Sequence, residues 1–315
     1  MSASETIQRQ TKRTTVHWYI LGAGAIGCLW AASFRRAGFP VTLITRDRRD
    51  SHRISLVTGD ETIECDLKTE TVAEFLASEQ VPSRLLVTTK AHHTDTALEA
   101  IRSRISNDTL LLILQNGLAA RQVAEEFPNS PLLAAITSDG AYRSDGMTVV
   151  FSGTGKTFIG SYDGTDHSGI LDELPTAFLD IEYCDDIEIR QWQKLAVNCA
   201  INGLTAIYHC RNGELLDKPQ ALASMERICN EVMAVTGALG FPPDRFAGCY
   251  EAARATARST AANYSSMYKD IEQGRRTEID FINGYLCREA NRLQISCPEN
   301  RAIVNAIKQL EQSHQ

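Results

Sequence analysis

The stretch Val16–Thr45 decides the fold of the N-terminal part of the chain; it reads VHWYILGAGAIGCLWAASFRRAGFPVTLIT. The apolar run Val16–Leu21 predicts a buried strand, and Ala25–Ala37, after a glycine-rich turn, predicts a helix closed by Gly38. A second strand is predicted at Val41–Thr45. Strand, helix and strand in this order form a βαβ unit, whose two strands lie parallel in one sheet.

The turn inside this unit has the sequence Gly22-Ala23-Gly24-Ala25-Ile26-Gly27. In such a turn the first glycine permits the tight bend, the second lets the backbone approach a pyrophosphate, and the third lets helix and strand pack closely. The free amides at the start of the helix then face the phosphates. These six residues are predicted to bind a dinucleotide; the alternative is a glycine-rich turn that holds no ligand.

The end of the second strand bears on which dinucleotide binds. An acidic residue there would hold a ribose 2′-hydroxyl, but this strand ends in Ile44-Thr45-Arg46, and the Arg46 guanidinium can pair with a 2′-phosphate. Arg48 and Arg49 add positive charge nearby, whereas Asp47 opposes it. The pattern predicts NADPH as the cofactor, with a solvated basic loop as the alternative.

Three further apolar runs, Leu85–Thr89, Thr109–Leu114 and Leu132–Thr137, alternate with helical patterns. This alternation predicts a mostly parallel sheet that is covered on both faces. Lys90 and Asn116-Gly117 follow two of these strands, and ligands bind at the carboxyl edge of such sheets. Lys90 and Asn116 are therefore candidate ligand-site residues; ordinary loop residues are the alternative.

The run Met147–Gly160 differs from the rest of the N-terminal part. Two short β-rich pieces flank Ser152-Gly153-Thr154-Gly155, which predicts a hairpin added to the sheet. Gly155-Lys156-Thr157 resembles the end of a phosphate-binding P-loop. That motif needs a glycine five positions before Gly155, where Val150 stands, so the hairpin is the better interpretation.

After about Asp186 long helical patterns dominate, and we place a domain boundary near Ile187. The predicted fold is α/β. A disordered tail at 1–15 precedes a Rossmann-type, doubly wound sheet at 16–187, and an all-helical substrate and catalytic domain follows at 188–315.

Composition excludes several classes of function. The chain has 315 residues and a net charge of −7, so it offers no basic surface for nucleic acid or anionic lipid. Its nine cysteines include no C-x-x-C pair, which argues against a disulfide framework and a metal site. No apolar run is long enough for a membrane span. We expect a cytoplasmic protein without metal, and we retain a homodimer as an expectation.

The most informative stretch is Gln191–Asn202, in which Lys194, Asn198 and Asn202 are four residues apart. In a helix that spacing places all three on one stripe, while the remaining positions are mostly apolar. Such a helix is buried and lines a cleft. A partly desolvated lysine can protonate an alkoxide near neutral pH, and asparagines can orient a carbonyl or hydroxyl without adding charge. An exposed polar stripe is the alternative.

A second polar cluster spans Asn263–Asp280. Ser266 could donate to a substrate carboxylate, and Glu278 could bind a substrate hydroxyl or hold Lys194, but on the residues alone ordinary polar helix positions are the favoured interpretation. His92 and His93 lie one turn past Lys90, where we expect surface or capping roles.

Taken together, the ordered motifs resemble the ketopantoate reductase family from Val16 to the C-terminal end. The segments that carry the resemblance are Gly22–Gly27, Lys90, Asn116-Gly117, Lys194-x-x-x-Asn198-x-x-x-Asn202, Asn212-Gly213, Ser265-Ser266-Met267, Thr277-Glu278-Ile279-Asp280 and Pro298-Glu299-Asn300. Two features depart from the family pattern. The N-terminal tail is extra, and Gly203 stands where proline is expected.

The resemblance implies a Rossmann domain joined to a helical domain, with NADPH and substrate bound in the cleft between them. It implies reduction of 2-dehydropantoate to (R)-pantoate, a step toward pantothenate and coenzyme A. By their match to family positions, Lys194 is the general acid and Glu278 is the glutamate of the cleft. The substrate contacts are Asn116, Asn198, Asn202, Asn212 and Ser266. The cofactor contacts are Arg46 and Lys90, together with Asn116 and Glu278.

Two alternatives stay open at this point. One is a related reductase of another small 2-oxo acid. The other is a catalytically silent NADP-binding sensor, which needs the glycine loop and Arg46 but has no use for Lys194 and Glu278.

Overall fold

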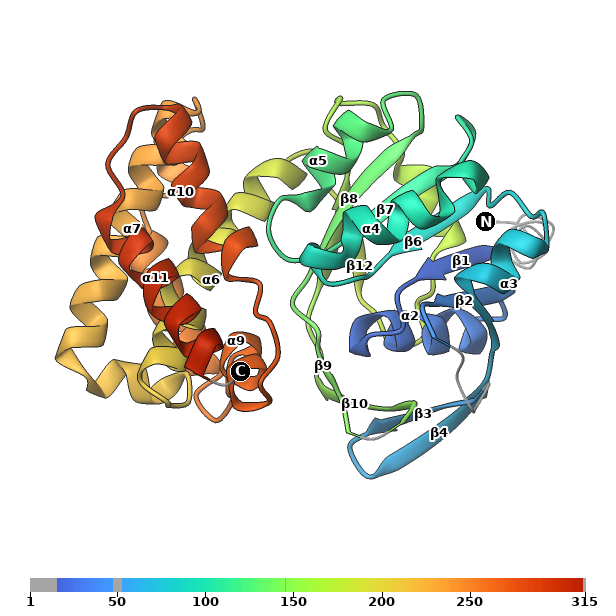
Figure 1. Ribbon diagram of the computed structural model, residues 1–315, viewed down its shortest axis with the longest axis horizontal. Coiled ribbons are helices and arrows are strands. Elements are labelled where there is room, and N and C mark those ends of the chain that lie inside the picture. The colour runs from blue at the N-terminus through green and yellow to red at the C-terminus, as the bar shows by residue number, and fades with distance from the viewer. Residues whose placement is uncertain (1–15, 48–52, 145, 314–315) are drawn as a thin grey trace, which may run out of the picture. The chain divides into compact units, whose positions relative to one another are not determined.

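The computed structural model describes residues 16–47, 53–144 and 146–313, which group into two compact units (Figure 1). The first unit comprises the chain up to Gln115 and Ala119–Ile187. The second comprises Asn116–Leu118 and Glu188–Gln315. The expected tail at 1–15 and the charged residues Arg48 and Arg49 lie outside the described residues.

An eight-stranded sheet forms the centre of the first unit, in the order β12-β11-β8-β7-β6-β1-β2-β5. The six strands β8-β7-β6-β1-β2-β5 are mutually parallel, whereas β11 runs antiparallel to β8 and β12 lies parallel to β11, so these last two run the other way. The strands are β1 (Trp18–Leu21), β2 (Val41–Thr45), β5 (Lys68–Thr71), β6 (Arg84–Val87), β7 (Leu110–Leu114), β8 (Leu132–Thr137), β11 (Thr157–Gly160) and β12 (Ile181–Tyr183). The predicted βαβ unit and mostly parallel sheet are confirmed.

Helices cover both faces of this sheet (Figure 1). One face packs against α2 (Ala25–Arg36) in a cluster that includes Ile20 and Leu112. The other face packs against α3 (Val72–Ala77), α4 (Ala91–Ile101) and α5 (Ala119–Glu126) in a second cluster. Because successive side chains of a strand point to opposite faces, each central strand contributes to both clusters, which explains its nearly continuous apolar sequence.

A second, four-stranded sheet packs on α2, in the order β4-β3-β10-β9. Its strands are β3 (Arg53–Thr58), β4 (Glu61–Asp66), β9 (Gly140–Arg143) and β10 (Thr148–Gly153). Helix α2 therefore has a sheet on more than one side. This explains why every residue of Gly27–Phe34 is buried, since a helix that is apolar all round needs neighbours all round.

The predicted hairpin over Met147–Gly160 is wrong. Strand β10 pairs with β3 and β9 in the small sheet, whereas β11 pairs with β8 and β12 in the large one. The turn between these two strands is held by the segment that precedes β9. The Gly155 N–H donates to the Asp139 carboxylate at 2.7 Å, and the Lys156 N–H donates to the Ser138 hydroxyl at 2.8 Å. These amides are used within the protein, so the P-loop resemblance has no structural counterpart.

Strands β3 and β4 form a hairpin that the sequence interpretation missed. Their turn is Gly59-Asp60, and Gly59 has a φ of +58°, a backbone conformation that favours glycine. A Gly-Asp pair between two β-rich runs is a hairpin signal. The charged residues of Glu61–Asp66 concealed it, because only Ile63 and Cys65 give this strand an apolar face.

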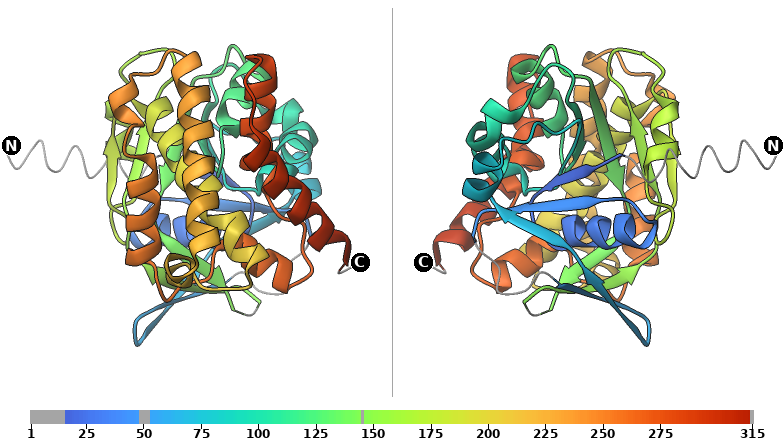
Figure 2. Two further views of the ribbon diagram at one scale, coloured as in Figure 1. Left: turned by 90° about the vertical axis from the view of Figure 1, so that its left-hand side faces the viewer. Right: turned by 90° about the vertical axis from the view of Figure 1, so that its right-hand side faces the viewer.

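The second unit is helical apart from its turns, and its helices are coloured from yellow to red in Figure 2. They are α6 (Ile187–Ile207), α7 (Pro219–Ala238), α8 (Cys249–Ser259), α9 (Ser266–Glu272), α10 (Asn283–Arg292) and α11 (Pro298–Ser313). All of them contribute to one apolar cluster, to which α6 supplies Leu195, Cys199 and Leu204. The predicted fold class, a doubly wound sheet with a C-terminal helical region, is confirmed.

Gly203 allows α11 to approach α6 closely. A Cβ atom at Gly203 would lie 2.4 Å from Cγ2 of Ile303, which is shorter than any normal contact. A proline here, as the family pattern led us to expect, would require Ile303 to move or to be smaller. Glycine in place of the expected proline therefore makes room for the large side chain of Ile303 on the facing helix.

A buried polar network joins four helices of this unit. The Asn283 amide donates to the Cys199 carbonyl at 3.1 Å and to the Asn300 side chain at 2.9 Å. Glu231 accepts from the backbone N–H groups of Glu299 and Asn300, and from the Asn300 amide at 2.7 Å. These bonds occupy the free amides at the start of α11. Pro298-Glu299-Asn300 is thus a helix-anchoring motif.

Candidate active site

Three of the segments predicted to bind the cofactor lie at one edge of the large sheet. Leu21, the last residue of β1, stands beside Ile44 of β2 and Val87 of β6, and both pairings are parallel. The segments that follow these strands therefore leave the sheet at the same edge. They carry the Gly22–Gly27 loop, Arg46 and Lys90, as ligand sites in parallel sheets require.

The three glycines of the loop meet different constraints. Gly22 has a φ of +114°, and a Cβ there would lie 2.8 Å from the Thr89 nitrogen. At Gly27 a Cβ would lie 2.0 Å from the Gly22 carbonyl oxygen. At Gly24 it would meet no atom within 4 Å, so the loop leaves open space at the position where a pyrophosphate would approach. This cradle fits a dinucleotide.

The turn after β6 is bonded to both neighbouring strands. The Thr88 hydroxyl donates to the Gly22 carbonyl at 2.9 Å, and the Gln115 amide donates to the Thr89 carbonyl at 2.7 Å. Lys90 follows as the N-cap residue of α4 and is half-buried. Sequence reasoning missed Thr88 and Gln115, although both directly follow strands of the sheet.

Arg46 is exposed at the end of β2, with a side-chain relative exposure of 82%. Its Nε donates to the Asp47 carboxylate at 3.1 Å. An exposed pair between adjacent residues contributes little stability, so this contact does not prevent Arg46 from reaching a phosphate.

Arg143 is a cation near the loop that the sequence did not reveal. It comes from β9 of the small sheet, and its Nη1 donates to the Ala23 carbonyl at 3.4 Å. Its Nη2 also donates to the Gly146 carbonyl. The two residues Ala23 and Arg143 are 120 positions apart, and no motif links them; the packing of the small sheet on α2 brings them together.

In the second unit, α6 carries the three polar residues of the predicted stripe. Lys194 and Asn198 are half-buried and Asn202 is buried, with 8% relative exposure. Between them the helix is apolar: Leu195, Cys199 and Ala200 contribute to the core. Complete burial raises the pKa of the Cys199 thiol well above its ordinary value, so this neighbour of Asn198 stays neutral.

Asn116 and Glu278 form a direct pair within this unit. The Asn116 amide donates to Oε2 of Glu278 at 3.0 Å, and Glu278 is buried, with 8% relative exposure. Gly117 lies against the same segment: a Cβ there would be 2.5 Å from the Phe281 carbonyl oxygen. The structure thus joins two site residues that the sequence separates by 162 positions.

A second group joins Asn202, Asn212 and the start of α9. The Thr205 hydroxyl bridges the Asn202 carbonyl at 2.9 Å and the Ser265 hydroxyl at 2.7 Å. Ser265 caps α9 by accepting from the Tyr268 N–H at 3.0 Å. Ser266 follows it and is exposed, so its hydroxyl can meet a substrate, whereas that of Ser265 serves the fold.

The Asn212 side chain is fixed but only partly satisfied. Its amide donates to the Thr260 hydroxyl at 2.8 Å, and its backbone N–H donates to the Asn263 carbonyl at 2.9 Å. Its Oδ1 is buried and has no hydrogen-bond partner among the described residues. A buried acceptor without a partner is costly, so a ligand hydroxyl is a suitable donor for it.

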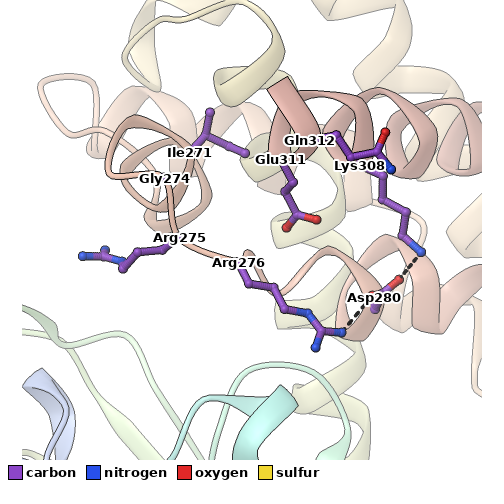
Figure 3. Close-up of a pocket in the computed structure, with 8 residues that line it drawn as sticks. All are labelled: Ile271, Gly274, Arg275, Arg276, Asp280, Lys308, Glu311 and Gln312. Carbon is purple, nitrogen blue, oxygen red and sulfur yellow. Dashed lines mark hydrogen bonds and ion pairs between the residues drawn. The ribbon is translucent and has the colours of Figure 1, made fainter. Parts of the chain in front are cut away.

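A cavity of about 340 Å³ adjoins the segment that carries Glu278 (Figure 3). Asp280 lies between the ends of Arg276 and Lys308, with N···O distances of 3.5 and 2.7 Å. Burial alone would raise the pKa of Asp280, but Lys308 and then Arg276 hold it below its ordinary value. Sequence reasoning placed Arg276 and Asp280 in a polar stretch but did not link them to Lys308.

The structure also bears on the expectations about His92 and His93, metal binding and membrane spans. His92 and His93 lie in the first turn of α4, and their rings stack edge to face at 4.2 Å. Within the described ranges, no group of His, Cys, Asp or Glu residues is arranged to hold a metal ion. A helix with the length and apolarity of a membrane span is also absent from the described parts of the chain.

Comparisons with known proteins match both parts of the chain to one enzyme family. The family described as "Ketopantoate reductase PanE/ApbA" matches residues 18–164, and "Ketopantoate reductase PanE/ApbA C terminal" matches residues 186–311. The 2-dehydropantoate 2-reductase of Vibrio cholerae is 34% identical over 300 residues, which cover 93% of this chain and 97% of that protein. The corresponding protein of Archaeoglobus fulgidus is 30% identical, with the same coverage.

Solved structures give the same result. A ketopantoate reductase family protein from Ralstonia eutropha JMP134 superposes with a TM-score of 0.83 at 26% identity, covering 95% of this chain and all of that one. A D-mandelate dehydrogenase bound to NADH and anilino(oxo)acetate superposes with a TM-score of 0.84 at 25% identity, covering 95% and 99% of the two chains. With both halves matched and the ordered motifs in place, the chain belongs to the ketopantoate reductase family, whose members are oxidoreductases.

Proposed function

We propose that this protein reduces 2-dehydropantoate to (R)-pantoate with NADPH, a step toward pantothenate and coenzyme A. The observation that carries the proposal is the polar stripe Lys194, Asn198 and Asn202 on an otherwise apolar helix. It occurs in a chain that matches 2-dehydropantoate 2-reductases over 93% of its length. A silent NADP-binding sensor would have no use for this stripe or for the buried Glu278.

The roles of the residues follow from their chemistry. NADPH, when bound, supplies the hydride for the ketone carbon. Lys194 donates a proton from Nζ to the oxygen that becomes the alcohol, because an ammonium can protonate an alkoxide as it forms. Asn198 and Asn202 orient the carbonyl and the substrate hydroxyls, and Asn212 accepts from a hydroxyl at Oδ1. Ser266 binds the carboxylate.

Asn116 and Glu278 act as a pair on the same substrate. The bond from the Asn116 amide to Glu278 fixes the carboxylate, whose remaining acceptor positions can hold a substrate hydroxyl or the Lys194 ammonium. We also assign both residues a part in holding the cofactor.

The choice of NADPH over NADH rests on Arg46. The Gly22–Gly27 loop suits the pyrophosphate of either cofactor, whereas an arginine after β2 favours a 2′-phosphate. The Arg46–Asp47 contact would break on binding, which costs little at an exposed site. Lys90, at the same edge, adds positive charge on the cofactor side.

A related 2-oxo acid is the second candidate substrate, because a structural neighbour is a D-mandelate dehydrogenase that binds NADH and an oxo acid analogue. The test is NADPH and NADH oxidation with a panel of 2-oxo acids: 2-dehydropantoate, its analogue lacking the hydroxyl, and phenylglyoxylate. We expect the highest kcat/KM with 2-dehydropantoate and NADPH. Higher kcat/KM with phenylglyoxylate would reassign the substrate, and no turnover with any acid would favour the sensor.

The proposal also includes a cellular location and an oligomeric state. A cytoplasmic location fits the nine free cysteines, of which eight are buried. A homodimer stays a prediction, which sedimentation of the purified protein can test.

A further inference from the structure

Two residues of α11 contact the chain on both sides of Glu278. Upstream, the Thr277 N–H donates to Oε1 of Glu311 at 2.7 Å. Downstream, Nζ of Lys308 lies 2.7 Å from Oδ1 of Asp280. Lys308 and Glu311 are three residues apart, so they project from the same face of the helix. One face of one helical turn therefore holds the chain one residue before and two residues after Glu278.

The local structure around Glu278 is too short to fix this side chain by itself. Glu278 precedes a single 3-10 turn, η5 (Ile279–Phe281), and its carbonyl accepts from the Phe281 N–H at 2.9 Å. Such turns have poor hydrogen-bond geometry and seldom extend. The Glu311 and Lys308 contacts involve ionised groups, and charge-assisted hydrogen bonds are roughly twice as strong as neutral ones.

The position of α11 does not depend on Glu278. Glu231 of α7 accepts from the N–H groups of Glu299 and Asn300 at 2.7 and 2.9 Å, which fixes the beginning of the helix. The last turn then reaches a buried segment: Thr277 has 2% relative exposure and Glu278 has 8%. An anchored helix whose far end bonds to a buried loop can set the place of that loop.

We propose that Glu311 and Lys308 are positioning residues for Glu278, Glu311 through the Thr277 backbone and Lys308 through Asp280. They hold the Glu278 carboxylate where the Asn116 amide meets it. This inference rests on the role of Glu278 in the function proposed above. Neither residue is among the substrate contacts assigned above, so we expect their effect on turnover to pass through Glu278.

The experiment compares Glu311→Ala, Glu311→Gln and Lys308→Met, each in the parent protein and in a Glu278→Ala background. The control is Arg301→Met, which removes a 2.8 Å contact to Asn291 from the other end of the same helix. The measurements are kcat and KM for 2-dehydropantoate, the pH profile of kcat/KM, and Tm for every variant.

In the parent background, Glu311→Ala should lower kcat/KM by about 10-fold to 100-fold, since misplacing a catalytic group by about 1 Å can have an effect of that size. Lys308→Met should lower it less, because its effect passes through Asp280. Glu311→Gln should recover most of the activity, since its amide oxygen still accepts from the Thr277 N–H. Arg301→Met should behave as the parent.

In the Glu278→Ala background, Glu311→Ala should have no further effect, because the group it positions is gone. An equal loss in both backgrounds would mean general destabilisation and would overturn the inference. So would parent-like activity of both Glu311→Ala and Lys308→Met beside an impaired Glu278→Ala enzyme. If Glu278→Ala itself kept parent activity, its proposed role would fail, and this inference with it. If Glu311→Ala does not fold, Lys308→Met provides the same test.

Discussion

Lys194 is the residue on which the proposed chemistry depends most. It is half-buried on α6, in line with Asn198 and Asn202. Lys194→Ala should lower turnover by about 10² to 10⁴, the usual effect of losing a general acid. NADPH affinity should change little, and the loss of activity at high pH that marks the ammonium should vanish in the variant. Steady-state kinetics and NADPH titration check this; near-parent turnover would refute the assignment.

Gly24 offers a second test, because the loop leaves its Cβ position empty. Its φ is −74°, which any residue adopts, and a Cβ there meets no protein atom within 4 Å. Gly24→Val should therefore leave Tm nearly unchanged while abolishing NADPH binding, measured by fluorescence titration. Gly27→Ala is the contrast: its Cβ would lie 2.0 Å from the Gly22 carbonyl oxygen, so it should destabilise the fold by about 1–3 kcal/mol. Unchanged NADPH affinity in Gly24→Val would remove the loop from the site.

Arg46 and Arg143 should affect the two cofactors differently. Arg46→Ala should weaken NADPH binding far more than NADH binding, because only NADPH has a 2′-phosphate. Arg143 bonds to the Ala23 carbonyl, beside the place where the pyrophosphate would lie, so Arg143→Ala should weaken both cofactors equally. The check is the dissociation constant of each variant for each cofactor. Arg53→Ala, which removes an exposed arginine of the same small sheet, is the control.

At the scale of elements, the sequence predicted what its local patterns determine. The glycine loop between strand and helix, the apolar central strands and the four-residue spacing on α6 each depend on neighbours in sequence. The wrong hairpin and the missed small sheet depend on pairing instead. Strand β10 pairs with β3, where Thr148 lies opposite Ser55, and nothing in Met147–Gly160 specifies that partner.

The candidate site also contains some residues that sequence spacing groups together and others that only long-range contacts bring together. Lys194, Asn198 and Asn202 could be grouped from their spacing alone. The Asn116–Glu278 bond and the contacts of Glu311 and Lys308 join distant segments, and each residue by itself is an ordinary surface type. Only the resemblance to a known family indicated Glu278, and nothing in the sequence indicated Glu311.

The contact between α11 and Asp280 makes a prediction about acid stability. The pKa of Asp280 is lowered in the folded state, so its contribution to stability is present above its unfolded value of 3.8 and is lost as the pH falls below it. Lys308→Met should therefore lower Tm at pH 6, and the difference from the parent should begin to narrow near pH 4 and close as the pH falls through the lowered folded-state pKa. Thermal melts across this range test it; a Tm difference that does not depend on pH would contradict the prediction.

At the scale of the whole molecule, the short segment Asn116–Leu118 belongs with the helices although it follows β7 of the sheet. Leu118 has 2% relative exposure and packs in the helical cluster. Leu118→Ala should destabilise the helical unit by about 2–5 kcal/mol, the usual effect of a buried leucine-to-alanine change. Leu112→Ala in β7 should instead affect the sheet unit.

Amide hydrogen exchange distinguishes these outcomes. In Leu118→Ala, exchange should accelerate in α6 and α10 and stay slow in β6 and β7, because local stability is lost where the packing is lost. In Leu112→Ala the pattern should reverse. Faster exchange in the sheet of the Leu118→Ala variant would contradict the assignment of this segment to the helical unit.

The Asn116–Glu278 pair also has a consequence for biosynthesis. The two residues are 162 positions apart, and ribosomes add roughly 5–20 residues per second, so Asn116 emerges roughly 8–30 s before its partner is made. When Asn116 is made, strands β8 to β12 and every helix of the second unit are still to be synthesised. Leu118 therefore stays without its helical cluster until those helices follow, and the Asn116 amide without its carboxylate partner until Glu278 is made.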